Sequence, residues 1–352
     1  RMLMENPGFE EELEQLLAHV TNPAKGQPRR FATLPAEQLE RISYEDSANI
    51  LFIGLPKTLR TSVAQGLYKR REDQREAYVL SASGCQTKRD LRQSLKSNLG
   101  ERRKTLTLAD FLLKNDIETL VVDDADGLVD GPLREIADEL NSRDLRLVAL
   151  GGFRLARDFV DQLLVHDFKP VRLERLRAED IQRWGREQVR QDETDGYGET
   201  FIIDEETVER LEAVTSGYVP LILRFKAYVR GELQRAREYF PEASHVEGFA
   251  RDILTEEVVR DDLLAPLSPT ARQVLGELYR AAGEDDHWTV EPEWLDQVWM
   301  PRLTETAGVS QMNVHDILDV LELVDLVNFT NTPVNGTLAL KPDGPLARAF
   351  VD

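Results

Sequence analysis

Five short apolar runs alternate with helix-like segments between residues 49 and 177, and this alternation constrains the fold more than any other feature of the chain. The runs are predicted as strands at Ile50–Ile53, Ala77–Ser81, Thr119–Asp123, Leu145–Leu150 and Pro170–Leu173. The segments between them are predicted as helices at 61–72, 88–99, 107–114, 131–141 and 153–164. Apolar strands separated by helices form a parallel sheet that is covered on both faces. We therefore predict an α/β fold with a parallel sheet and helices on both faces.

The rest of the chain is predicted to be mainly helical. From residue 263 onward, three helices are expected at 269–282, 291–304 and 313–325. Two short apolar runs then flank Asn335-Gly336, a strong hairpin signal. Three helices followed by a hairpin indicate a winged helix. We predict an N-terminal helical segment (1–48), an α/β core (49–177), a helical lid (178–262) and a winged-helix domain (263–352).

Composition limits the compartment and the partners. The 352 residues have one cysteine, Cys85, which fits a reducing compartment, and no apolar run approaches the roughly 18 residues of a membrane span. We therefore expect a cytoplasmic protein with no membrane partner. The net charge of −20 argues against a surface coated by nucleic acid. The charge is uneven, because residues 49–177 contain 23 Lys and Arg against 20 Asp and Glu.

The segment after the first predicted strand is similar to a phosphate-binding loop. In the pattern G-x-x-x-x-G-K-[ST], glycines let backbone N–H groups surround the phosphates, and the lysine reaches their oxygens. Aligned from Gly54, this chain has Leu59 for the second glycine and Arg60 for the lysine, and it keeps Thr61. A Cβ at 59 crowds an anion, and a guanidinium does not replace a compact ammonium. A variant loop in another register is the alternative.

A second motif follows the third predicted strand. Thr119–Asp123 is apolar and ends in an acid, and Asp124 follows it. In a Walker B strand the first acid holds Mg²⁺ and the second polarises the attacking water. Asp123 fits the first role, and Asp124 stands where a longer Glu is usual. The alternative is a plain strand followed by an acidic turn.

Together, these motifs and the winged helix resemble P-loop ATPases of the AAA+/STAND type, over roughly residues 30–352. The initiator-like (ORC/Cdc6) and the transposition or secretion ATPases are the most similar groups. The resemblance implies ATP with Mg²⁺ as cofactor. It also implies catalytic roles for Asp123 and Asp124, and Mg²⁺ ligation by Thr61 and Asp123. The nucleotide-binding residues that it implies are Gly54, Arg60, Thr61 and Pro220.

The chain departs from that family at several further positions. Gly151-Gly152 offers no polar sensor side chain, and Asp167 stands where an arginine finger is common. Pro220 stands where initiator-type members place a sensor arginine, although it matches the lid turn of STAND-like members. Losing one such group costs orders of magnitude in rate. With the altered loop, these changes predict a degenerate site with weak or absent hydrolysis.

A basic segment at 86–104 is the best candidate for binding DNA. Its cations are Lys88, Arg89, Arg92, Lys96, Arg102, Arg103 and Lys104. The alternatives are a solvated helix face, which is the commoner explanation, or a surface for an acidic partner, including this protein's own termini. The winged helix is not expected to bind DNA, because 313–325 has no Lys or Arg and 263–352 contains 14 acids against 5 bases.

The leading functional hypothesis is a regulatory or adaptor subunit of a multiprotein complex. Its partner would be another P-loop ATPase or further copies of itself. Two alternatives stay open from the sequence. One is an ATP-dependent DNA-binding switch of the initiator or transposition kind, and the other is a STAND-type signalling sensor.

Overall fold

A computed structural model shows two compact units that divide after Leu173. The structure describes residues 49–55, 77–99, 107–161, 164, 168–173, 175–179, 181–182, 204–236, 241–284, 289–290, 300–327, 329–331, 338–340, 345–346 and 350. The expected N-terminal helical segment and the expected helix at 61–72 lie outside these ranges. The four-part division of the chain therefore stays a prediction.

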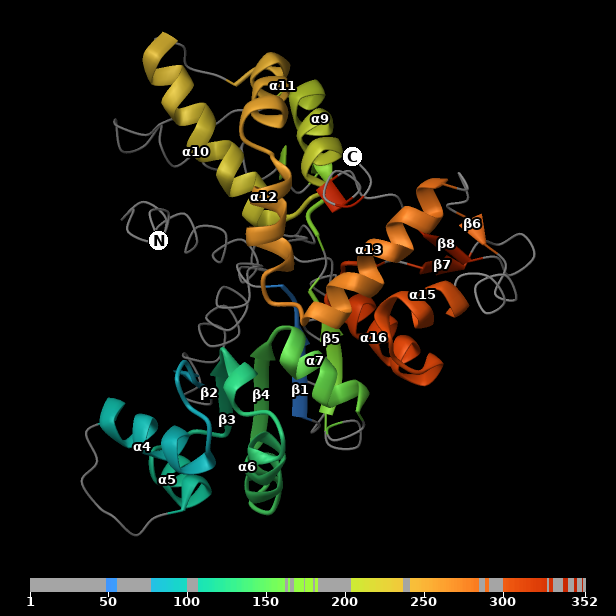
Figure 1. Cartoon of the computed structure of the whole chain (residues 1–352). Coiled ribbons are helices and arrows are strands. Elements are labelled where there is room, and N and C mark those ends of the chain that lie inside the picture. The colour runs from blue at the N-terminus through green and yellow to red at the C-terminus, as the bar shows by residue number, and fades with distance from the viewer. Residues whose placement is uncertain are drawn as a thin grey trace. The chain divides into compact units, whose positions relative to one another are not determined.

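The first unit is built on a five-stranded parallel sheet, which confirms the predicted α/β class. Its strands are β1 (Asn49–Ile53), β2 (Ala77–Ser81), β3 (Thr119–Asp123), β4 (Arg146–Gly151) and β5 (Phe168–Arg172). Their order across the sheet is β2-β3-β4-β1-β5, as Figure 1 shows. All five strands lie within two residues of the predicted positions.

Burial explains why the strands are apolar throughout. Every residue of β1 and β3 is buried, as are the last five residues of β4, whereas the edge strands β2 and β5 are partly exposed. Because successive side chains of a strand point to opposite faces, full burial means that both faces are covered. One face contributes the cluster Ile50, Phe52, Val121, Val148, Leu150, Val171 and Leu173.

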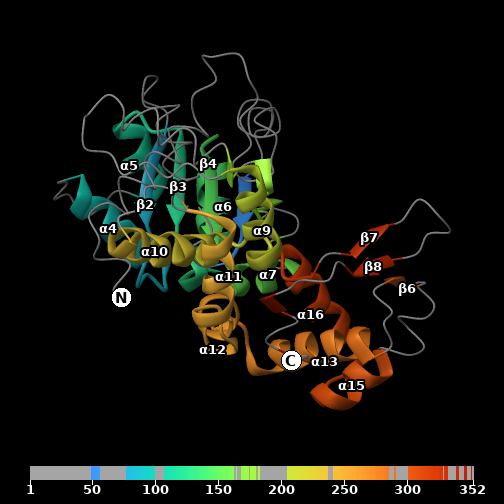
Figure 2. The same cartoon turned by 90° about the horizontal axis from the view of Figure 1, so that it is seen from above.

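From β2 to β5, each next strand of the chain lies further in the same direction across the sheet. The described helices of this unit form the connections between these strands. They are α4 (Lys88–Asn98), α5 (Leu108–Lys114), a 3-10 turn η2 (Ala125–Gly127), α6 (Pro132–Asn141) and α7 (Phe153–Val160). The right-handed crossover rule places α4 to α7 on one face. The view from above in Figure 2 shows these helices beside the sheet. The connection from β1 to β2 runs in the opposite direction.

The second unit contains helices in the range predicted as a lid, which are called the lid helices, and a C-terminal module. The lid helices are α9 (Glu205–Thr215), α10 (Val219–Ala236) and α11 (Ala243–Asp252). A connector follows, made of α12 (Glu256–Val259) and the π-helical turn η3 (Arg260–Leu264). The module comprises α13 (Pro269–Glu284), α15 (Met300–Ala307), α16 (Gln311–Leu323), β6 (Thr289–Val290), β7 (Phe329–Asn331) and β8 (Leu338–Leu340).

The small sheet of the module is antiparallel, in the order β6-β8-β7. The pairing of β7 with β8 confirms the expected hairpin strands, and β6 adds a strand that was not predicted. The assignment of the module as a winged helix stays a prediction. None of the described helices combines the length and the apolar character that a membrane crossing requires.

Candidate functional site

The candidate site lies at the carboxyl edge of the parallel sheet. Ile53 pairs with Gly151, and the N–H of Gly54 donates to the carbonyl oxygen of Gly151 at 3.1 Å. Across the sheet, the strand that follows β1 in the chain (β2) lies in one direction, and the strand that follows β4 (β5) lies in the other. Ligands of open α/β sheets bind at the carboxyl ends of strands where the connections diverge in this way. Gly54 and Asp123, two of the predicted site residues, therefore lie at the expected edge.

Asp123 ends β3 and is 9% exposed. Its Oδ1 accepts the N–H of Asp124 at 2.9 Å, and its carbonyl oxygen accepts the N–H of Ala82 at 2.7 Å. These bonds hold Asp123 at the junction of β2 and β3. A buried carboxylate at a strand end can ligate Mg²⁺, so Asp123 is the described residue that would hold the metal of a bound nucleotide.

Asp124 lies just beyond the strand, in a left-handed turn. Its φ is 57° and its side chain is exposed. Asp tolerates this conformation better than most residues do. The chain therefore leaves the strand direction immediately after Asp123, and Asp124 does not continue the alternation of β3. Its proposed role in polarising water stays a prediction.

Asp126 has a structural role that the sequence did not suggest. Its Oδ2 accepts the N–H of Gly152 at 2.8 Å, and its Oδ1 accepts the N–H of Leu155 at 3.2 Å. Neither donor has an acceptor within the helix, because both lie at the N-terminus of α7, where a negative charge is favourable. Asp126 thus fastens the turn after β3 to the first turn of α7. Its partners lie 26 and 29 residues further along the chain, so no local pattern could identify it.

Gly151, at the position of the expected sensor side chain, is fixed by packing. A Cβ built there would lie 2.7 Å from Cδ2 and 2.9 Å from Cβ of Leu155, which is fully buried. Contacts this short force α7 away from the sheet. The absence of a polar side chain at the end of β4 therefore follows from the close approach of α7.

The other residues of the predicted nucleotide site are only partly described. Arg60, Thr61 and Asp167 lie outside the described residues. The N–H of Gly54 is bonded to Gly151, so this group does not serve as a free donor to a phosphate. Pro220 is buried in the first turn of α10, a place that suits a proline. No group of three or more possible metal ligands is present in the ranges that the structure describes.

Several side chains of the basic helix α4 form contacts within the first unit. Thr87 and Asp90 form a capping box at its start, and Leu91 and Leu95 are buried. Lys88 forms an ion pair with Glu139 of α6 and donates to the carbonyl oxygen of Glu135 at 3.4 Å.

This contact also affects Glu139. Burial alone would raise the pKa of Glu139, but hydrogen bonds from Lys88 and the Ala109 N–H outweigh burial and lower that pKa. Lys88 therefore holds α4 on α6.

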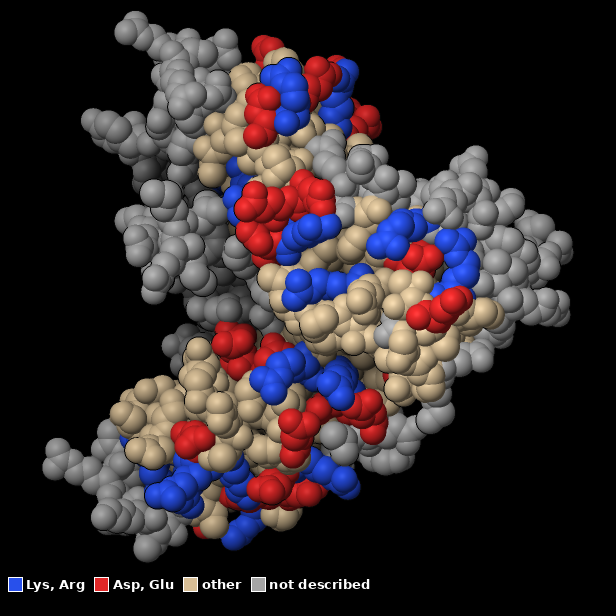
Figure 3. All heavy atoms as spheres, in the orientation of Figure 1, with Lys and Arg blue, Asp and Glu red and all other residues tan. Residues whose placement is uncertain are grey.

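The remaining cations of the segment form a smaller surface than predicted. Arg89 is exposed, Arg92 and Lys96 are half-buried, and Arg102, Arg103 and Lys104 lie outside the described residues. Figure 3 shows basic and acidic side chains interspersed over the described part of one face of the molecule. DNA binding through 86–104 stays a prediction, with Lys88 the weakest of its residues.

Asp158 of α7 is a buried carboxylate that the sequence did not single out. It is 5% exposed, and its Oδ2 accepts the N–H of Asp130 at 2.7 Å. Burial raises its pKa, and the bond from Asp130 only partly opposes this effect. Together with Asp126, it fixes both ends of the loop 126–130 to α7.

We expect Asp158→Asn to become relatively more stable than the wild type as the pH rises. A raised folded-state pKa means that ionisation disfavours the folded wild type, and this cost grows between about pH 4 and pH 7. The amide cannot ionise, yet its oxygen can still accept from Asp130. The stability difference should grow by on the order of 1 kcal/mol over that interval. Urea unfolding at both pH values measures it, and the exposed Asp138→Asn serves as control. A difference that is flat with pH, or that falls, contradicts the expectation.

Comparisons with known proteins give a fold-level likeness. A search of protein-family models finds no match, and a search of curated proteins finds none either. Among solved structures, the chain is similar to the RuvB Holliday junction branch migration motor of Thermotoga maritima. The identity is 11%, the TM-score is 0.43, and the match covers 94% of this chain and 91% of that chain.

Two further structures show a similar degree of likeness. A chain of Drosophila ORC bound to DNA is 14% identical, with a TM-score of 0.44, covering 96% of this chain and 91% of that chain. Cdc6p from Pyrobaculum aerophilum is 14% identical, with a TM-score of 0.43, covering 95% and 96%. At these values, functional conclusions depend on the residues of this chain.

Proposed function

We propose that this chain is an AAA+-like protein with a degenerate nucleotide site, and that it acts as a regulatory or adaptor subunit in a multiprotein complex. One observation carries the proposal: most of the polar groups that the structure describes at the carboxyl edge are used for structure. Asp126 binds α7, the Gly54 N–H binds Gly151, and packing of Leu155 keeps a side chain from Gly151. Asp123 is the described group that remains suited to a metal. Phosphoryl transfer needs several charged groups placed at once, and the part of this edge that the structure describes offers only Asp123 and the exposed Asp124, which favours a role in assembly.

The proposed partner is a second P-loop protein or another copy of this chain. In either case the parallel sheet and lid would serve as a scaffold. A bound ATP with Mg²⁺ would be held by Asp123 together with the residues of the loop after Gly54. The charges of the nucleotide and the metal would stabilise the fold, and the nucleotide would not be hydrolysed.

ATP turnover by the full chain and by Asp123→Asn tests the absence of catalysis. We expect the two rates to agree within about twofold, because a site with Arg60 in place of the lysine and Gly151 in place of a polar sensor residue gains little from Asp123. We also expect millimolar Mg-ATP to leave the melting temperature unchanged. A ligand at about 100 times its Kd would add about 2.7 kcal/mol and raise that temperature by several degrees. Turnover that disappears in Asp123→Asn contradicts the proposal.

Isolation of the full-length chain from its native cells tests the adaptor role. A complex of fixed stoichiometry with a second P-loop protein supports the proposal, whereas the chain alone with bound ATP overturns it. Salt-sensitive DNA binding that disappears when Arg89, Arg92 and Lys96 are neutralised would favour the DNA-binding switch. Lys88 is excluded from that variant because of its ion pair with Glu139.

A further inference from the structure

A buried polar junction joins three segments of the second unit that lie far apart in the sequence. The segments are the chain around Arg175, the lid turn at Gly217-Tyr218 between α9 and α10, and Asp325 just after α16. Asp325 is 4% exposed and has a φ of 61°. Its Oδ2 accepts both the backbone N–H of Arg175, at 3.0 Å, and the Nε of Arg175, at 3.1 Å.

Tyr218 completes the junction from the lid. Its side chain is 1% exposed, and the guanidinium of Arg175 lies over its ring, 4.8 Å from the centroid. Its hydroxyl donates to the carbonyl oxygen of Asp325 at 3.3 Å. Arg175 therefore forms an ion pair with Asp325 of the module, and its planar guanidinium lies over the ring of Tyr218 of the lid. Lysine could not reproduce this double contact.

The lid turn is fastened to the same segment by the backbone. The N–H of Leu176 donates to the carbonyl oxygen of Gly217 at 2.9 Å, and the N–H of Ala178 donates to the Glu212 carboxylate of α9 at 3.0 Å. Because this segment is bonded to both the lid and the module, a movement of either one must displace the other or break these bonds.

A second ion pair fastens the connector between lid and module. Arg224 of α10 forms a two-pronged ion pair with Asp262 in η3, and Asp262 is 5% exposed. Buried pairs of this kind favour one arrangement, because separating them leaves charges in an apolar interior. The lid is thus joined to the module at two places. One is the segment at Arg175, and the other is the connector at Asp262.

From these contacts we propose that the lid helices and the C-terminal module form one conformational unit, with the Arg175–Asp325–Tyr218 junction as the coupling element. A partner that moves the module therefore also moves the lid turn at Gly217–Pro220, and a change at that turn reaches the module. The coupling rests on contacts within this unit and does not depend on the proposed adaptor function. It assigns a regulatory role to residues that the sequence did not mark.

Hydrogen exchange of the full chain tests the coupling. Asp325→Asn is the main variant, because Asn tolerates the left-handed backbone, keeps one acceptor oxygen and loses the charge. We expect amide exchange to become about tenfold faster in two places at once, at 318–327 around the change and at 215–222 in the lid turn, as fits the loss of a charge-assisted hydrogen bond. Tyr218→Phe, which removes only a hydroxyl, should accelerate exchange in both places by a smaller factor.

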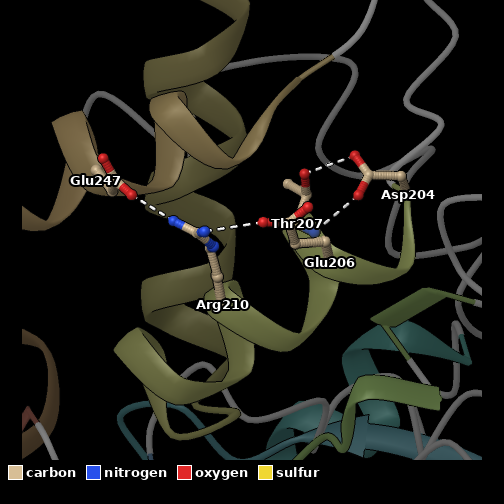
Figure 4. Close-up of polar contacts among 5 residues, drawn as sticks. All are labelled: Asp204, Glu206, Thr207, Arg210 and Glu247. Carbon is tan, nitrogen blue, oxygen red and sulfur yellow. Dashed lines mark hydrogen bonds and ion pairs between the residues drawn. The ribbon is translucent and has the colours of Figure 1, made fainter.

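The control is an ion pair confined to the lid. Arg210 of α9 binds Glu206 in its own helix and Glu247 of α11, and all three side chains are well exposed (Figure 4). Glu247→Gln should leave exchange at 318–327 unchanged. The coupling is overturned if Asp325→Asn affects 318–327 alone, or if Glu247→Gln accelerates 318–327 equally. If Asp325→Asn does not fold, Tyr218→Phe decides, and faster exchange confined to the lid turn then refutes the proposal.

Discussion

Replacing Gly217 by alanine should destabilise the second unit by about 2–5 kcal/mol. Gly217 has a φ of +75°, a conformation that costs a residue with a Cβ about 1–2 kcal/mol. A Cβ there would also lie 1.9 Å from the carbonyl oxygen of Leu176, which is backbone and cannot rotate away. The segment at Leu176 must therefore move, at a further cost of about 1–3 kcal/mol, and its bond to the Gly217 carbonyl weakens. Urea unfolding followed by circular dichroism measures the loss.

Gly308 provides a matched control in the same unit. Its φ is +64°, and a Cβ at this position would meet nothing within 4 Å. Gly308→Ala therefore has the backbone cost without the collision and should lose about 1–2 kcal/mol. The difference between the two variants isolates the contact with Leu176. Equal losses would mean that the lid turn does not press against the segment at Leu176.

The sheet was predictable because its strands are buried on both faces. A strand such as β1, buried at all five positions, needs an unbroken apolar run, and such runs are visible without any knowledge of partners. Some helix starts were also visible, because the bonds involved span a few residues. Asp204 and Ser268 accept N–H groups three residues ahead, and Asp and Ser are residue types that favour this position before a helix.

The contacts of the junction in the second unit and of the candidate site were not predictable in the same way. Asp325 and Arg175 lie 150 residues apart, and nothing local distinguishes Asp325 from other acids of an acidic domain. The Asp-rich turn Asp123–Asp126 shows the same limit. The sequence places several carboxylates together, but only the fold shows that one ends a strand, one lies in an exposed turn and one binds α7. Residue type thus indicates a carboxylate site, whereas long-range bonds decide the role of each carboxylate.

That difference of roles leads to the second large effect, at Asp126. Asp126→Ala removes both acceptors for the N–H groups of Gly152 and Leu155, and each unsatisfied, partly buried donor costs about 1–3 kcal/mol. We expect a loss of about 2–4 kcal/mol in unfolding free energy and faster exchange of the Ala156 N–H, which is bonded to Gly152 within α7. Unfolding and exchange measured on the same full-length protein would check both.

A pair of isosteric changes separates the structural acid from the exposed one. Asp126→Asn keeps one acceptor but loses the charge at the start of α7, so it should cost about 1–2 kcal/mol. Asp124→Asn keeps a residue that tolerates a φ of 57° and should change stability by less than about 0.5 kcal/mol. Equal costs would show that the two acids share one role and that α7 does not depend on Asp126. A cost confined to Asp126 would mean that the acidic turn after β3 supports the packing of α7 through Asp126 alone, because the side chain of Asp124 then contributes nothing to it.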